Sequence, residues 1–73
     1  MNQMSVLGAD GDTKIKWDPT DPSSVMDAES MFKCLTDKGY RAFSVKGDGR
    51  GTKITKFDVN AGEIVMLRPL AGG

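Results

Sequence analysis

The residues best placed to do chemistry in this chain are the last two, Gly72 and Gly73, which follow Leu70 and Ala71. Glycine has no Cβ, so its backbone adopts conformations closed to other residues, and a glycine carboxylate can be threaded into a narrow enzyme channel. A carboxylate is a poor acyl donor, but adenylation by ATP turns it into a mixed anhydride, and transfer to an enzyme cysteine gives a thioester. The sequence therefore predicts a reactive terminal carboxylate. The alternative is an unreactive end, because chain termini are often small and poorly ordered.

Other catalytic chemistry finds little support in the sequence. The chain has no histidine, which removes His-based acid-base catalysis, Ser-His and Cys-His nucleophiles and ordinary zinc sites. The glycine-rich segment 47–53 lacks the G-x-x-x-x-G-K-[ST] spacing of a phosphate loop and is typical of a hairpin turn. We therefore expect no enzymatic activity, no metal and no cofactor.

Length and composition narrow the class of protein further. The 73 residues suffice for one small domain, which leaves little room for both a core and a deep enzyme pocket. Ten basic and ten acidic residues cancel, so no basic excess indicates nucleic-acid binding. The apolar runs are too short to span a membrane, and we expect no signal peptide from residues 1–4, which have no basic segment followed by a long apolar one. The single cysteine, Cys34, cannot form an internal disulfide, and we expect a reducing, cytoplasmic location.

The first half of the chain predicts a hairpin. Residues 3–7 and 13–17 are strand-like, and a turn rich in glycine and aspartate separates them. The second strand alternates, with Thr13, Ile15 and Trp17 on one face, which is the pattern of a half-buried strand.

A helix is predicted to follow the hairpin. Pro22 suits the first helical position with Asp21 as N-cap, and Ser23 or Ser24 is the alternative cap. Gly39 suits the position just past the end. One face carries apolar side chains at spacings of three, four and three, namely Val25, Ala28, Phe32 and Leu35. The charges expected to complement the helix dipole are Asp27 and Glu29 near the start and Lys33 and Lys38 toward the end.

The second half predicts three strands, at 40–45, 52–57 and 64–67. In the first of them we expect Phe43 and Val45 to point inward. In the second, Ile54 and Phe57 cannot share a face without a bulge. The third strand is apolar at every position, as strands in mid-sheet often are, and Pro69 should end its pairing because proline has no N–H to donate.

This order of elements predicts an α+β fold in which the helix packs on one face of a mixed sheet. The place of the last strand stays open. Its apolar character favours the centre of the sheet. The short connection after residue 57 favours a plain three-stranded meander, with the last strand at the edge beside the fourth.

The element order, the length and the Gly-Gly ending together resemble ubiquitin-like proteins of the β-grasp fold, of the bacterial or phage modifier and sulfur-carrier type. The resemblance covers the whole chain as a pattern. It implies a ββαβββ sheet with the first and last strands parallel at its centre, in one domain of residues 1–73, with residues 69–73 as a flexible tail. Leu70 stands in the place of the leucine before Arg-Gly-Gly in ubiquitin, and Ala71 stands where ubiquitin has that arginine.

The resemblance implies a protein modifier or sulfur carrier without enzymatic activity. Activation and conjugation would take place at Gly73 and Gly72, and the tail would be recognised through Leu70, Ala71 and Arg68. The implied partners are an ATP-dependent activating enzyme, a conjugating enzyme or isopeptidase, and target proteins, with no nucleic acid and no membrane.

The rival interpretation is a non-conjugated phage or bacterial accessory protein that binds a partner through its sheet face or an edge strand. Trp17 is expected in the core. If it is exposed instead, it marks a partner surface, and Met66 is a second candidate for such a surface.

Overall fold

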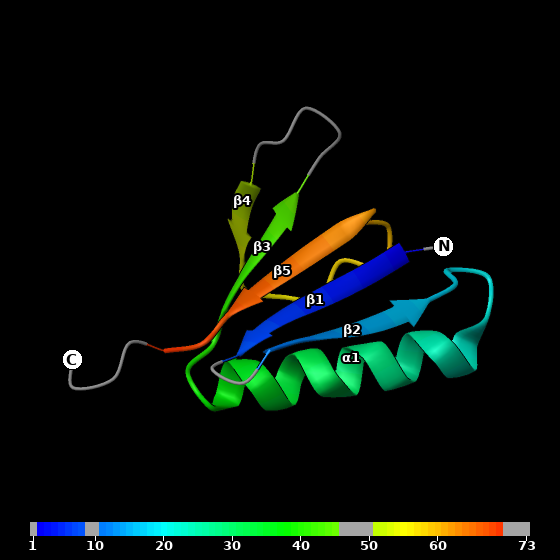
Figure 1. The fold of residues 1–73 in the computed structure, drawn as a ribbon. Coiled ribbons are helices and arrows are strands. Elements are labelled where there is room, and N and C mark those ends of the chain that lie inside the picture. The colour runs from blue at the N-terminus through cyan, green and yellow to red at the C-terminus, as the bar shows by residue number, and fades with distance from the viewer. Residues whose placement is uncertain (1, 9–10, 46–50, 70–73) are drawn as a thin grey trace.

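The computed structural model describes residues 2–8, 11–45 and 51–69. Over these residues the fold is α+β, with one helix packed on one face of a five-stranded mixed sheet (Figure 1). The elements are β1 (Asn2–Gly8), β2 (Gly11–Trp17), α1 (Pro22–Asp37), β3 (Arg41–Val45), β4 (Gly51–Ile54) and β5 (Glu63–Leu67). The strand order across the sheet is β2-β1-β5-β3-β4.

The last strand, β5, lies at the centre of the sheet. It pairs in parallel with β1 and antiparallel with β3, so both of its edges are hydrogen-bonded. The prediction drawn from its uninterrupted apolar run is confirmed, and the alternative of a strand at the edge beside β4 is wrong. Ile64 and Met66 point into the core and are fully buried, while Val65 and Leu67 lie on the opposite face.

The link between β4 and β5 carries the chain past β3 to this central position. Residues 55–62 pass along the core side of the sheet, where the Phe57 ring lies between Trp17 and Phe32, at centroid distances of 5.0 and 5.8 Å. Asn2 Nδ2 then donates to the Ala61 carbonyl at 2.7 Å, which holds the link beside the start of β1. Phe57 follows β4 rather than belonging to it, so no bulge is needed to bring it inward.

The core lies between α1 and the sheet. Of the predicted helix face, Ala28, Phe32 and Leu35 are buried and Val25 is partly buried, which confirms the helical periodicity. No helix among the described residues is long and apolar enough to cross a membrane. The buried apolar residues are Met4, Trp17, Ala28, Phe32, Leu35, Ala42, Ala61, Ile64 and Met66.

The orientation predicted for the third strand is wrong. Ala42 and Ser44 point into the core and are buried, whereas Phe43 and Val45 lie half-buried on the other face. The register with β5 explains the difference, because Ala42 stands beside Met66 and Ser44 beside Ile64. Small side chains fit on the core face at these two positions, next to long ones.

The ends of α1 follow the predicted capping but not the predicted charge pattern. Asp21 is the N-cap and accepts a hydrogen bond from the Ser23 N–H at 3.1 Å, Pro22 is the first helical residue, and Gly39 has φ +95° just past the end. No acidic residue lies in the first turn and no basic residue in the last, because the helix begins early enough to place Asp27 in its second turn.

Candidate functional site

The candidate site is the place where the chain leaves the centre of the sheet. The strand pairing of β5 ends at Leu67, and Arg68 and Pro69 continue outside the sheet. Gly39 has no side chain, and a Cβ there would lie 3.4 Å from Cβ of Pro69, so the proline packs against the end of α1. The exit of the chain is therefore set by packing as well as by the missing proline N–H.

A hollow of about 380 Å³ opens beside this exit, and residues from three strands line it. Leu7 of β1 and Arg41 of β3 both pair with Leu67, so the three side chains stand in one row across the sheet. Gly8 and Arg68 complete the lining. The hollow thus combines two leucine side chains with two guanidinium groups, which suits a partner that is both aliphatic and acidic.

The hollow belongs to the face of the sheet that α1 does not cover, here called the open face. Leu67 is 39% exposed there, and Phe43 and Val65, which pair with each other, are half-buried. Ser5 lies beside Val65 on the same face and donates to Glu63 Oε2 at 3.4 Å. The middle of the open face is therefore apolar with a short polar strip.

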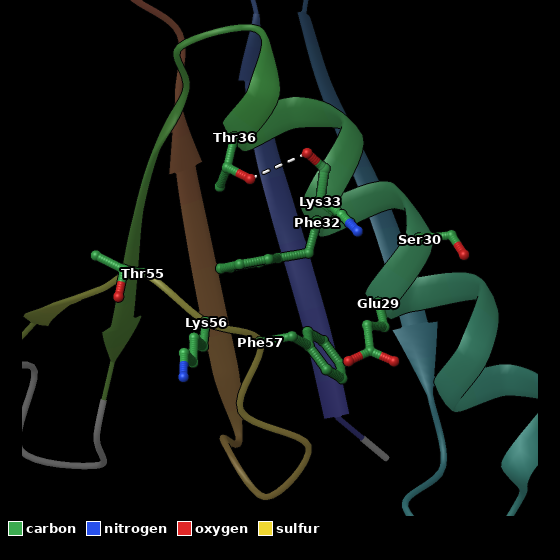
Figure 2. Close-up of a pocket in the computed structure, with 8 residues that line it drawn as sticks. All are labelled: Glu29, Ser30, Phe32, Lys33, Thr36, Thr55, Lys56 and Phe57. Carbon is green, nitrogen blue, oxygen red and sulfur yellow. Dashed lines mark hydrogen bonds between the residues drawn. The ribbon is translucent and has the colours of Figure 1, made fainter.

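A second hollow, of about 690 Å³, lies on the core side of the sheet between α1 and the link after β4 (Figure 2). The helix runs along β2 and β1 and leaves β3 and β4 less covered (Figure 1). Phe32 and Phe57 form an aromatic floor, with Lys33, Lys56 and Glu29 around it. The Thr36 hydroxyl donates to the Lys33 carbonyl at 3.0 Å. This hollow can hold a small apolar group with a charged edge.

The residues predicted for the site fall into three groups. Arg68 is exposed and lines the hollow beside β5. The suggestion that Met66 and Trp17 form a partner surface is wrong, because both are fully buried, and the expectation that Trp17 lies in the core is confirmed. The remaining tail residues Leu70, Ala71, Gly72 and Gly73 lie outside the described residues.

Leu7, Arg41 and Leu67 were not predicted as site residues. They are far apart in the sequence and become neighbours only through the pairing of β1 and β3 with β5. A local signal could have found part of this row. Once Ala42 and Ser44 are assigned to the core face, the alternation of the strand places Arg41, Phe43 and Val45 together on the other face.

Within residues 2–8, 11–45 and 51–69, no group of three or more cysteine, aspartate or glutamate side chains is arranged to hold a metal ion. Comparison of the chain with protein-family models, with curated proteins and with solved structures finds no match.

Proposed function

We propose that this chain is a ubiquitin-like β-grasp protein that an ATP-dependent enzyme activates at a carboxylate on Gly73. The observation that carries the proposal is the place of β5. It lies parallel to β1 at the centre of the sheet and ends at Leu67, so Arg68 and Pro69 leave the middle of the sheet at one end of the fold (Figure 1). A central strand is held on both edges, which gives a tail attached to it a fixed point of departure.

In the proposed reaction the Gly73 carboxylate attacks the α-phosphate of ATP, which forms an acyl adenylate and releases pyrophosphate. A thiolate of the activating enzyme then displaces AMP and forms a thioester. A lysine amine on a target would displace that thiolate to form an amide. In a sulfur carrier, a persulfide of the activating enzyme would instead displace AMP to form an acyl disulfide. A second thiolate of that enzyme would then attack the disulfide, which releases the thiocarboxylate and leaves the two enzyme cysteines joined as a disulfide.

The hollow beside β5 supports this proposal because it lies where such an enzyme would have to hold the domain. Leu7 and Leu67 offer apolar contact, and Arg41 and Arg68 offer cationic groups for carboxylates of the enzyme. Docking here would leave the residues after Pro69 to enter the catalytic channel.

The test begins with the intact mass of the protein isolated from its own host, which must correspond to a chain ending at Gly73. The purified chain is then incubated with ATP, labelled pyrophosphate and the activating enzyme encoded nearest its gene. We expect pyrophosphate exchange into ATP, loss of exchange on deletion of Gly73, and at least a tenfold rise in the KM of the activating enzyme for the Arg41→Glu chain.

Met26→Ala, on the exposed side of α1, should leave exchange unchanged. A natural chain that continues past Gly73, or no exchange with the wild type, contradicts the proposal.

A second candidate function is a non-conjugated interaction domain. The exposed Leu67 and the half-buried Phe43 and Val65 on the open face favour it, because an apolar patch on a sheet is a common contact surface. In that case removal of residues 70–73 should leave partner binding unchanged, whereas Phe43→Glu should abolish it.

A further inference from the structure

The hollow of Figure 2 takes no part in the proposed activation, because it lies on the core side of the sheet and not on the open face. α1 forms one wall of this hollow, and the link after β4 forms the other. Its volume of about 690 Å³ falls within the roughly 300–1,000 Å³ that is usual for clefts that bind small molecules. The hollow therefore has room for a ligand of one or two rings.

The floor of the hollow consists of two aromatic rings that the core holds in place. Phe32 is 3% exposed, and its ring meets that of Phe57 edge-on, at a centroid distance of 5.8 Å. The Phe57 ring packs in turn against the fully buried Trp17, at 5.0 Å. A flat apolar group that enters the hollow thus meets a surface that is already formed, which lowers the cost of binding. Aromatic pairs attract each other beyond the effect of the area that they bury, so the floor favours an aromatic ligand over an aliphatic one.

The helical wall of the hollow carries charges that offset each other. One strip of α1, about 100° wide at 3.6 residues per turn, supplies a carboxylate, an aromatic ring, an ammonium group and a hydroxyl, from Glu29, Phe32, Lys33 and Thr36. Glu29 stands four residues before Lys33, which is the spacing and the order at which opposite charges attract on a helix. The Thr36 hydroxyl donates its proton to the Lys33 carbonyl. The helical wall alone therefore has no net charge with which to attract an ion.

The wall formed by the link adds an ammonium group that no carboxylate of the same wall balances. Its lining residues are Thr55, Lys56 and Phe57, and Lys56 is exposed. The whole lining therefore holds two lysines and one carboxylate, which favours a ligand with a single negative charge. A phosphate monoester has a charge of about −1.5 to −2 at neutral pH. It carries more charge than the lining offsets, and Glu29 repels it.

We propose that this hollow binds a small aromatic carboxylate, a molecule of one or two rings that bears a single carboxylate group. The rings lie against Phe32 and Phe57, and the carboxylate interacts with the ammonium groups of Lys33 and Lys56, which come from opposite walls (Figure 2). Both lysines are exposed, so the ligand reaches them from solvent without a change in the fold. This hollow shares no lining residue with the hollow beside β5, so the inference goes beyond the proposed function and does not depend on it.

Titration of the full chain with 2-naphthoate, followed by two-dimensional NMR, tests the proposal. We expect the methyl signals of Thr36 and Thr55, one from each wall, to shift together, while the methyl signal of Thr13 in β2, outside the hollow, stays in place. A dissociation constant of about 0.1–1 mM is expected for a ligand of about a dozen heavy atoms. Salt at about 500 mM should weaken binding severalfold, because the charges of the two exposed lysines are then screened.

Two analogues of the probe separate the effect of the rings from that of the charge. The alcohol 2-naphthalenemethanol keeps the aromatic rings and lacks the charge, whereas decalin-2-carboxylate keeps the charge and lacks the aromatic rings. Each analogue should bind at least about threefold more weakly than 2-naphthoate, because each loses one of the two interactions. Only the two carboxylates should respond to salt.

Substitutions of the charged residues around the hollow should change the affinity in opposite directions. Lys33→Gln/Lys56→Gln should raise the dissociation constant for 2-naphthoate at least about fivefold. Glu29→Gln should lower it about two- to threefold, because the repelling carboxylate is removed. The three positions are exposed, so these variants should fold, which circular dichroism spectra and unfolding midpoints establish. The matched controls Lys53→Gln and Asp12→Asn make the same changes of charge on the open face and should bind like the wild type.

Several outcomes overturn the proposal. They are no shift of the Thr36 and Thr55 signals at about 5 mM probe, an affinity that Lys33→Gln/Lys56→Gln leaves unchanged, and weaker binding by Glu29→Gln. Equal affinity for decalin-2-carboxylate would show that the floor does not select an aromatic ligand. A blocked peptide with adjacent tryptophan and aspartate presents the same two groups as the probe. If this peptide shifts both signals and 2-naphthoate does not, the hollow binds a protein segment and the proposal is wrong.

Discussion

Trp17 joins the first hairpin to the link after β4. It is fully buried at the end of β2, and its ring packs against Phe57 of the link after β4. Its Nε1 donates to the Val59 carbonyl at 3.0 Å. One side chain therefore fixes the first hairpin to the link that brings β5 to the centre of the sheet.

Replacing Trp17 by phenylalanine should lower the free energy of unfolding by about 1–3 kcal/mol, since it removes part of a buried aromatic ring and one hydrogen-bond donor. The loss is limited because Asn2 Nδ2 still donates to the Val59 carbonyl. Urea unfolding followed by far-UV circular dichroism measures it. Met26→Ala, at a largely exposed position, serves as the control and should change stability by less than about 0.5 kcal/mol. An unchanged midpoint for Trp17→Phe would contradict the position given to the indole.

At the scale of the element, the N-terminus of α1 depends on its cap. The first turn holds no acidic residue that could interact with the helix dipole, so the unpaired N–H groups there rely on the Asp21 side chain. Ser24 adds a second link, because its hydroxyl accepts from the Asp18 N–H at 3.0 Å and ties the preceding loop to the helix.

Asp21→Ala should therefore lower the free energy of unfolding by about 0.5–2 kcal/mol, the usual range for a lost N-cap. Asp27→Ala is the matched control, because it removes the same carboxylate from an exposed position inside the helix, where no cap is lost. Thermal or urea unfolding of both variants gives the comparison. Equal effects of the two substitutions would mean that the charge of Asp21, rather than its hydrogen bond to Ser23, supports the helix.

At the scale of the whole molecule, local patterns predicted the elements better than the faces. The order of strands and helix, the buried stripe of α1 and the caps follow from periodicity and turn residues, and the structure has them. The orientation of β3 could not be predicted from its own sequence. Phe43 and Val45 are the more apolar side chains of the strand, so the local pattern places them in the core. The orientation is decided by Met66 and Ile64 of β5, which leave room only for Ala42 and Ser44 on the core face.

The candidate site, like the orientation of β3, depends on which strands lie beside β5. Arg68 could be singled out from its place near the end of the sequence. The hollow beside it required knowledge that β1 and β3 flank β5, which no local pattern contains. The exposed apolar patch was missed for the same reason that β3 was turned the wrong way, since Phe43 was placed in the core.

The two faces of β3 can be distinguished by placing the same charge at neighbouring positions. Ala42 is 1% exposed and stands beside Met66, so Ala42→Glu buries a carboxylate and overfills the core. A domain of this size has a free energy of unfolding of only about 4–11 kcal/mol, and we expect Ala42→Glu to be unfolded at 25 °C.

Phe43→Glu sets its carboxylate on the open face beside Lys53. This variant should remain folded, with its free energy of unfolding lowered by less than about 2 kcal/mol. Circular dichroism with thermal unfolding compares them. A folded Ala42→Glu with an unfolded Phe43→Glu would reverse the orientation of β3, and the open face described above would then be part of the core.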